Sequence, residues 1–148
     1  MIQSNMLRIG NLVSYKGQCL TISELRENGV YFKEETHWKY DEFVSYEDLE
    51  PIEITEEILL RMGFEKDGFN AYNISIAWHE DQYKSLYFSG DYLFLREGEH
   101  PTSRAYDDVC VLWNKDLMKK FYVHSLQNLY SLLTQGKELT FKDLTTKD

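Results

Sequence analysis

The sequence predicts an α+β protein in which short antiparallel strands dominate and two helices complete the fold. Aromatic residues make up 15% of the 148 residues and there are only two prolines, a balance that favours packed sheet over disorder. Turn-forming pairs recur between short alternating segments, and two later segments carry apolar residues at helical spacing. With 43% hydrophobic residues, a chain of this length can bury a core without disulfides.

Residues 1–52 are predicted to form a small β-barrel. Their pattern indicates five short strands, at 8–15, 19–25, 30–33, 38–40 and 43–46. A turn is expected at 16–18, and the pair Asn28-Gly29 is a strong hairpin signal, because both residues tolerate the positive φ of a type I′ turn. Closing such strands into a barrel removes the exposed edges that an open sheet would present.

Two stretches of this segment resemble an SH3-like barrel. They are the opening Arg8-Ile9-Gly10-Asn11-Leu12-Val13-Ser14-Tyr15-Lys16-Gly17 and the closing Glu47-Asp48-Leu49-Glu50-Pro51-Ile52. The resemblance implies a small SH3-like barrel over residues 1–52. Because such barrels serve as peptide readers, nucleic-acid modules and structural appendages, the resemblance does not select a function.

Residues 53–148 are predicted to form an antiparallel sheet packed with a short linking helix and a C-terminal helix. The linking helix is expected over 55–62. Thr55 can accept hydrogen bonds from first-turn amides, Glu56 and Glu57 suit the positive end of the helix dipole, and Gly63 can end the helix in a left-handed conformation.

The sheet itself is expected from four strands joined by connections too short for helical crossovers, at 71–79, 85–88, 91–96 and 109–113. The C-terminal helix is expected over about 124–134, with Gly136 placed to terminate it. We expect this helix to pack across the second sheet, because Leu126, Leu129 and Leu133 form an apolar stripe along it.

Several stretches together resemble a family of small uncharacterised proteins found in bacterial and bacteriophage genomes. They are Tyr122-Val123-His124-Ser125-Leu126-Gln127-Asn128-Leu129-Tyr130, Lys137-Glu138-Leu139-Thr140, Ile58-Leu59-Leu60-Arg61-Met62-Gly63-Phe64-Glu65-Lys66, Leu49-Glu50-Pro51-Ile52 and the Arg8-Ile9-Gly10-Asn11 opening. The resemblance implies a bacterial or phage origin and brings no activity with it. Ser125 stands where such relatives usually have Gln, so the resemblance does not make a three-amide cluster essential.

The charge of the chain disfavours bulk binding of nucleic acid. There are 16 Lys and Arg residues against 25 Asp and Glu residues, for a formal net charge of -9. A phosphate-binding surface needs clustered basic side chains, and the densest cluster here is Lys115, Lys119 and Lys120. The acidic surplus favours a well-solvated surface instead.

The sequence predicts a cytoplasmic protein that does not span a membrane. Cys19 and Cys110 are the only cysteines and lie far apart in predicted strands, so a secreted disulfide framework is not expected. The first residues lack the basic-then-apolar order of a signal peptide, and no uncharged apolar run approaches the length of a membrane span.

No motif points to a metal, a cofactor or a nucleophile. The sequence His79-Glu80-Asp81 is the nearest approach to a metal cluster, but neighbouring strand residues point to opposite faces, and a third ligand such as His37 or His100 would have to come from elsewhere. Cys110 lies between two valines in an apolar strand, a setting in which thiols are inert. We therefore expect neither a bound metal nor a bound cofactor.

A polar cluster on the C-terminal helix, His124, Gln127 and Asn128, admits two interpretations. These side chains could bind or transform a ligand. The favoured interpretation is that His124 satisfies the helix start while the two amides hydrogen-bond neighbouring backbone and fix the helix on the sheet.

The barrel carries more aromatic residues than a fifty-residue unit can easily bury, so some of them are expected at the surface. A partner-binding face is assigned to five of them: Tyr15, Tyr31, Trp38, Tyr40 and Tyr46. Exposed Tyr and Trp bury much area at small entropic cost, which suits protein interfaces. The alternative, left open here, is that they pack the seam between the barrel and the second sheet.

These observations predict a non-enzymatic interaction or structural protein that binds another protein or itself. A competing hypothesis is a small hydrolase or nuclease-like enzyme that uses His79, His124 and carboxylates across a cleft. A third is nucleic-acid binding through the barrel, which would require a basic stripe formed by Arg8, Lys16, Lys33 and Lys39.

Overall fold

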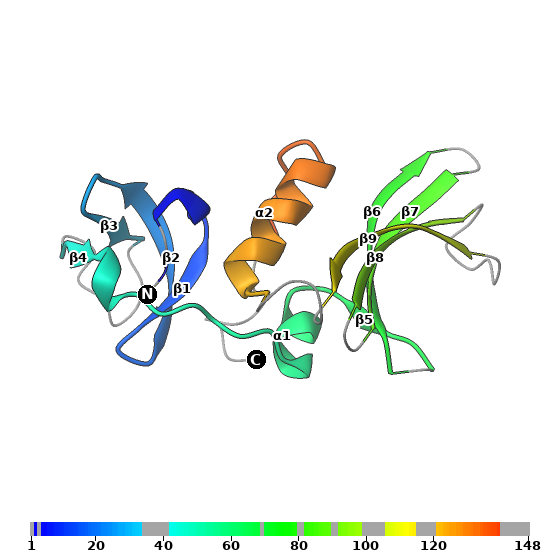
Figure 1. Ribbon diagram of the computed structural model, residues 1–148, viewed down its shortest axis with the longest axis horizontal. Coiled ribbons are helices and arrows are strands. Elements are labelled where there is room, and N and C mark those ends of the chain that lie inside the picture. Colours follow the sequence, from blue (N-terminus) through cyan, green and yellow to red (C-terminus); the bar gives the residue numbers. More distant parts are fainter. Residues whose placement is uncertain are drawn as a thin grey trace.

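The computed structural model describes residues 2, 4–33, 42–68, 70–79, 82–89, 92–98, 106–114 and 121–139. Within these residues the chain is α+β, with two antiparallel sheets and few helices. The four-stranded sheet lies at one end of the molecule, the five-stranded sheet at the other, and the C-terminal helix between them (Figure 1). Neither helix of the described chain has the length and hydropathy needed to cross a bilayer.

The N-terminal sheet has the strand order β1-β2-β3-β4. Its elements are the 3-10 helix η1 (Ser4–Met6), β1 (Leu12–Tyr15), β2 (Gln18–Leu25), β3 (Gly29–Phe32), β4 (Val44–Ser45) and the 3-10 helix η2 (Tyr46–Asp48). Ser14 exchanges two backbone hydrogen bonds with Glu50, so the chain returns to β1 and the sheet curls on itself. The predicted strand at 38–40 lies outside the described residues.

The two hairpin turns of this sheet differ from the expectation. Lys16 and Gly17 have φ of 50° and 80°, and they join Tyr15 directly to its partner Gln18, as a two-residue type I′ turn does. No positive φ occurs at Asn28 or Gly29, so the predicted type I′ turn there is wrong although a hairpin forms.

The second part of the chain begins with α1 (Glu56–Arg61), which confirms the predicted linking helix. The Thr55 side chain accepts a hydrogen bond from the Ile58 amide, and Gly63 has a φ of 100°. The strands that follow pair in the order β5-β6-β7-β8-β9. They are β5 (Glu65–Lys66), β6 (Tyr72–His79), β7 (Gln82–Ser89), β8 (Tyr92–Gly98) and β9 (Tyr106–Asn114). The two-residue β5 was not expected.

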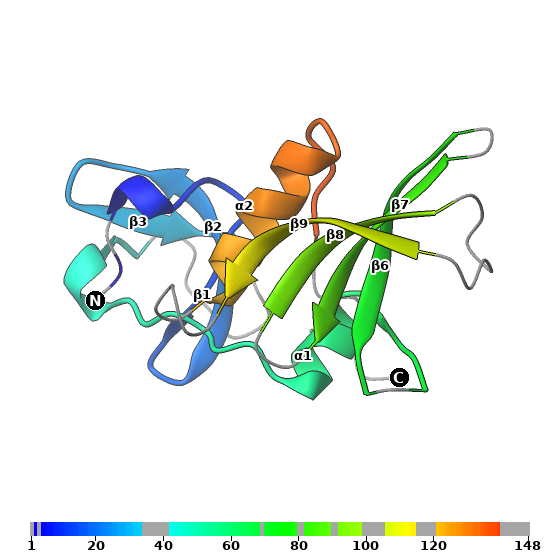
Figure 2. The same ribbon diagram turned by 45° about the vertical axis from the view of Figure 1, so that its right-hand side comes forward.

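The C-terminal helix, α2 (Val123–Leu133), ends as predicted. The Gly136 amide donates to the Ser131 carbonyl, and Gly136 has a φ of 102°. The start of the helix differs, because Tyr122 is the N-cap residue and makes no side-chain capping bond. His124 therefore does not satisfy the helix start. The turned view of Figure 2 also places α2 between the two sheets, so it does not lie across the second sheet alone.

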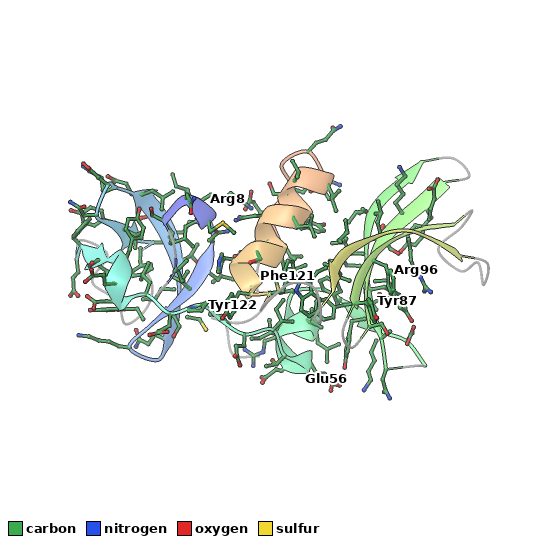
Figure 3. The ribbon with its side chains drawn as sticks, in the orientation of Figure 1. Arg8, Glu56, Tyr87, Arg96, Phe121 and Tyr122 are labelled. Carbon is green, nitrogen blue, oxygen red and sulfur yellow. The ribbon has the colours of Figure 1, made fainter. Side chains whose placement is uncertain are left out.

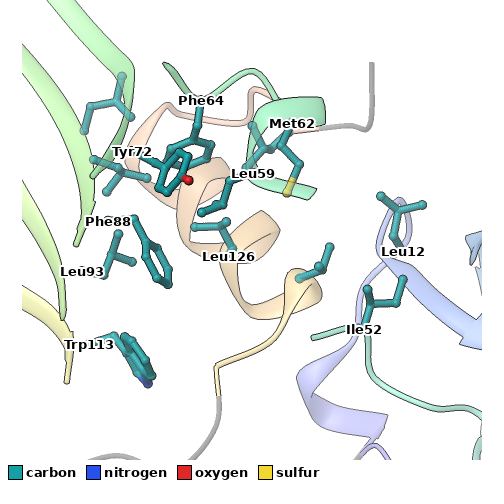
Figure 4. Packing of buried hydrophobic residues seen from close by; sticks show 14 residues of the cluster. Leu12, Ile52, Leu59, Met62, Phe64, Tyr72, Phe88, Leu93, Trp113 and Leu126 are labelled. Carbon is teal, nitrogen blue, oxygen red and sulfur yellow. The ribbon is translucent and has the colours of Figure 1, made fainter. Parts of the chain in front are cut away.

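Two hydrophobic cores hold the molecule together. The N-terminal sheet encloses its own core, whose largest fully buried members are Ile22, Phe32 and Leu49. The larger core lies between the five-stranded sheet, α1 and α2, and Figure 4 shows its side chains around Leu126. Leu12 and Ile52 also belong to this larger core and reach it from the N-terminal side.

Candidate functional site

The two amides of the predicted polar cluster lie inside the molecule. The Gln127 side chain is fully buried, and its oxygen accepts from the Leu12 amide at 2.8 Å. Its nitrogen donates to the carbonyl oxygens of Leu139 at 2.9 Å and Gly10 at 3.2 Å. Asn128 donates to the Met6 carbonyl at 3.0 Å. The two amides hydrogen-bond backbone groups, as predicted. These groups do not belong to neighbouring residues of the helix but to the N-terminal residues 6–12 and to Leu139.

Asn11 completes this network and was not singled out from the sequence. It is fully buried, its nitrogen donates to Asn128 at 2.8 Å, and its oxygen accepts from the Arg8 amide at 2.8 Å. The Arg8 guanidinium donates to the Gln127 carbonyl at 3.2 Å and to the Glu138 carboxylate at 3.0 Å. Since the network consumes its own polar groups, it offers few of them to a ligand.

His124 is the third member of the cluster and lies apart from the amides. Only 4% of the residue is exposed, and its Nδ1 atom has no hydrogen-bond partner among the described residues. Its ring stacks on Tyr122, with centroids 5.9 Å apart. Desolvation lowers the pKa of His124, so the imidazole is neutral at physiological pH. A neutral, buried ring is a weak candidate for the acid in an acid–base pair.

The side chains of the other candidate histidines lie outside the described residues. His79 ends strand β6, and its side chain lies outside the description, as do His37 and His100. No group of three His, Cys, Asp or Glu side chains that could hold a metal ion occurs among the residues described. Cys19 is exposed by surface area, but the residues around it partly desolvate its thiol and raise the pKa of that thiol, which keeps the thiol protonated and poorly nucleophilic.

The assigned barrel aromatics are distributed over different environments. Tyr15 is buried at 8% exposure and packs on Phe32, so its ring belongs to the core of the N-terminal sheet. Tyr46 is half-buried and donates a hydrogen bond to the Arg26 carbonyl. Trp38 and Tyr40 lie outside the described residues.

Among the described members of that set, Tyr31 has an exposed aromatic neighbour. Its ring meets Phe43 edge to face at 5.4 Å, and Phe43 is 43% exposed. The Arg26 guanidinium lies 5.7 Å from the centre of the Tyr31 ring. These three residues form a small cluster on the surface of the N-terminal sheet.

A larger aromatic surface lies on the five-stranded sheet and was not predicted as a site. Side chains alternate along β7 and β8, so Leu86, Phe88, Leu93 and Leu95 face the core while Tyr87, Tyr92, Phe94 and Arg96 take the opposite face. Figure 3 shows Tyr87 and Arg96 on the side of the sheet away from α2. We call Tyr87, Tyr92, Phe94 and Arg96 the outer aromatic face.

The members of the outer aromatic face contact one another. The rings of Tyr92 and Phe94 stack with centroids 5.6 Å apart, and Phe94 is the cross-strand partner of Tyr87. The Arg96 guanidinium lies 3.6 Å from the centre of the Tyr87 ring. The Tyr87 hydroxyl also donates a hydrogen bond to the Asp67 carboxylate at 3.0 Å. Desolvation is the larger cause that raises the pKa of Tyr87, and this hydrogen bond raises it further. The rings are therefore held in fixed positions on the sheet.

A signal for this surface exists in the sequence. Tyr92 and Phe94 are two residues apart and alternate with Leu93 and Leu95, so one of the two faces had to carry both rings. Which face would point to solvent could not be decided, because both are apolar. Only the position of α1 and α2 resolves that ambiguity.

Comparison of the chain with protein-family models, with curated proteins and with solved structures finds no match.

Proposed function

We propose that this chain is a non-enzymatic interaction protein that binds a protein partner through the outer aromatic face. The observation that carries the proposal is the stacked pair of Tyr92 and Phe94, which lies on the face of the sheet opposite the core. Tyr92 is 38% exposed. Fixed aromatic rings suit protein recognition because they bury a large area and lose little conformational entropy.

The edges of the five-stranded sheet offer less to a partner than its face does. The edge strand β5 has only two residues and pairs with β6 at Tyr72 and Asn73 alone. From residue 74 onward β6 itself forms this edge, and its register is irregular between Ser75 and Ala77. The other edge strand, β9, has two bulge-like irregularities in its pairing with β8. The consecutive residues Leu93 and Phe94 pair with Trp113 and Val111, so residue 112 is skipped. Leu95 and Arg96 likewise pair with Cys110 and Asp108, so residue 109 is skipped. Short or bulged edges are poor templates for strand addition. This comparison favours recognition through the face.

A secondary surface is the cluster of Tyr31, Phe43 and Arg26 on the N-terminal sheet. Of the five aromatic residues assigned to a partner-binding face from the sequence, this cluster contains Tyr31. The curling of that sheet supports an SH3-like identity, which we include in the proposal. The bacterial or phage origin also stays a prediction, carried by the resemblance of the quoted stretches alone.

The experiment is affinity capture from a lysate of the encoding organism, with partners identified by mass spectrometry. The test variant is Tyr92→Thr with Phe94→Thr, because Thr retains the preference for strand while removing both rings. The matched control is Leu132→Gln, which removes the most exposed large apolar side chain of α2 (78%). A second variant, Phe43→Thr, tests the surface on the N-terminal sheet.

We expect wild type and Leu132→Gln to recover the same partner, and the double variant to lose it. Circular dichroism establishes that the double variant is folded. Equal recovery by wild type and the double variant would refute the outer aromatic face as the binding surface. Loss in Phe43→Thr alone would move recognition to the N-terminal sheet.

A further inference from the structure

The two hydrophobic cores meet at a joint that is mainly polar. Among the described residues of β1–β4, only Leu12 contributes to the larger core. Ile52, which follows the N-terminal sheet, also packs in the larger core, and hydrogen bonds and an ion pair form the polar contacts across the joint. Interfaces of this kind between parts of one chain allow relative motion more readily than large apolar interfaces do.

The centre of the joint is formed by three side chains, Asn11, Gln127 and Asn128, which we call the amide latch. Gln127 uses both amide hydrogens and both acceptor positions, since its oxygen receives Leu12 and, at 3.5 Å, Asn11. Asn128 bonds to Asn11 and to the Met6 carbonyl. Every one of these bonds, except that to Leu139, links α2 to the N-terminal segment.

The ion pair at the rim of the joint joins Arg8 to Glu138. Both side chains are partly exposed, at 32% and 45%. Arg8 additionally holds the Gln127 carbonyl, so the rim and the amide latch act on the same turn of α2. Water can replace each of these partners when the joint opens, because all of them are polar.

The covalent connection across the joint is a single residue. Glu50 is paired with Ser14 in the N-terminal sheet, whereas the Ile52 carbonyl accepts from Val123 at the start of α2. Pro51 lies between them, and the next residue, Glu53, bridges to Tyr122. The segment from Ile52 onward is therefore attached to α2, which places the pivot in the connection between Glu50 and Ile52.

We infer that the amide latch is a conformational device. When it is closed, it holds the N-terminal sheet against α2. When it is open, that sheet moves about the short connection between Glu50 and Ile52, and the polar groups of the latch are hydrated. The core of the N-terminal sheet stays packed, and among the described residues of β1–β4 only Leu12 leaves the larger core. The device controls the placement of the Tyr31 cluster relative to the outer aromatic face, and it does not depend on which of the two surfaces binds a partner.

Gln127→Glu tests the inference with almost no change in shape. The introduced carboxylate still accepts from the Leu12 amide, but its second oxygen faces the carbonyl oxygens of Gly10 and Leu139, which it cannot bond. Lowering the pH protonates the carboxylate and restores one donor. The nearby charged or titratable groups, Arg8, Glu138 and His124, are present in wild type too, so wild type at the same pH corrects for them.

The measurement is the distance between two spin labels, one on each sheet. The native Cys19 is exposed on β2, and Ser75→Cys adds an exposed thiol on β6. Cys110→Ala removes the other cysteine from every protein compared. Hydrogen exchange of the Leu12 amide, which donates to Gln127, and of the Phe88 amide, which lies in the larger core, reports on the joint and the core separately.

We expect one narrow distance distribution for wild type at about pH 8 and about pH 5. In Gln127→Glu at the higher pH we expect a broad distance distribution that is shifted to longer distance. Hydrogen exchange of the Leu12 amide should be faster there, while the Phe88 amide stays as protected as in wild type. At the lower pH the distance distribution should narrow again. Asn128→Ala should give a smaller shift of the same sign, and Leu132→Gln should give none.

Two results would overturn the inference. If the distance distribution of folded Gln127→Glu matches wild type at the higher pH, the amide latch does not hold the sheets. If protection at Leu12 and Phe88 is lost together in both Gln127→Glu and Asn128→Ala, the joint is part of one cooperative core and has no open state of its own.

Discussion

Two buried polar side chains of α2, His124 and Gln127, lie about one turn apart and have opposite surroundings. Gln127 satisfies all of its hydrogen-bonding capacity, whereas His124 leaves Nδ1 without a partner among the described residues. Protonating an imidazole in such a place creates a positive charge that burial has deprived of hydration. Desolvation therefore lowers the pKa of His124 in the folded protein.

This buried imidazole predicts a loss of stability in acid. The unfolded chain has the ordinary pKa of about 6.5 and takes up a proton first as the pH falls. As the pH falls from the pKa of the unfolded chain to the lower pKa of the folded protein, unfolding is increasingly favoured. Above the pKa of the unfolded chain, His124 is neutral in both states and this loss of stability disappears. His124→Phe retains the stacking on Tyr122 and cannot titrate. We expect its unfolding temperature to fall less than that of wild type between about pH 8 and about pH 5. An identical fall in both proteins would contradict this assignment.

At the scale of single elements, the hairpins of the N-terminal sheet separate two roles of glycine. In the turn Lys16-Gly17, glycine provides a positive φ. At the start of β3, Gly29 provides space, because a Cβ atom there would lie 2.2 Å from the backbone oxygen of Val44 on the neighbouring strand. Backbone cannot move aside as the end of a flexible side chain can, so the approach of β3 and β4 requires glycine.

The close approach of β3 and β4 predicts a large effect of Gly29→Ala. We expect the free energy of unfolding to fall by about 3 kcal/mol or more, since the strands must separate to admit the methyl group. The matched control is Gly68→Ala, where no atom lies within 4 Å of the added carbon. There the change should be neutral or stabilising by about 0.5 kcal/mol. Urea unfolding of both variants checks the contrast, and equal effects would show that β4 yields easily.

At the scale of the whole molecule, the decisive element is α2. Its apolar side packs on the five-stranded sheet through Leu126, while its amides reach the N-terminal opening through Gln127. Arg8 extends that attachment to Glu138, 130 residues away in the chain. Segments from both termini are in this way held on one helix.

The long-range role of Arg8 predicts that the ion pairs of this protein contribute unequally to the free energy of unfolding. Arg8→Ala removes bonds to Glu138 and to the buried Gln127 carbonyl, and we expect it to lower the free energy of unfolding by about 1–2 kcal/mol. Arg61→Ala removes only a surface pair with Glu57 one helical turn away, for which about 0.5 kcal/mol is expected. Chemical unfolding of the two variants measures the difference. An equal cost would mean that the Arg8 contacts are no more than surface contacts.

Local features of the fold could be predicted because their causes lie within a few residues. Thr55 and Gly63 define the ends of α1 through hydrogen bonding and φ, and Gly136 ends α2 in the same manner. The expected Asn28-Gly29 turn does not form, because β2 and β3 pair Leu25 with Val30 and the Arg26 amide donates to the Gly29 carbonyl. This register places Glu27 and Asn28 in the turn and Gly29 at the start of β3, and strand pairing rather than the dipeptide decides it. The polar cluster was likewise recognisable as residues but not as contacts, because Asn11 and Gln127 are separated by 116 positions.

What the sequence determined by itself was the α+β class, the antiparallel strands, the linking helix and the C-terminal helix, because periodicity and capping act over short distances along the chain. The tertiary structure alone decided that the face of β7 and β8 with Tyr87, Tyr92 and Phe94 lies opposite the core, and which backbone the amides of α2 bind. Both depend on where α2 packs. That position results from burial of apolar surface summed over distant segments, and no local pattern of residues encodes it.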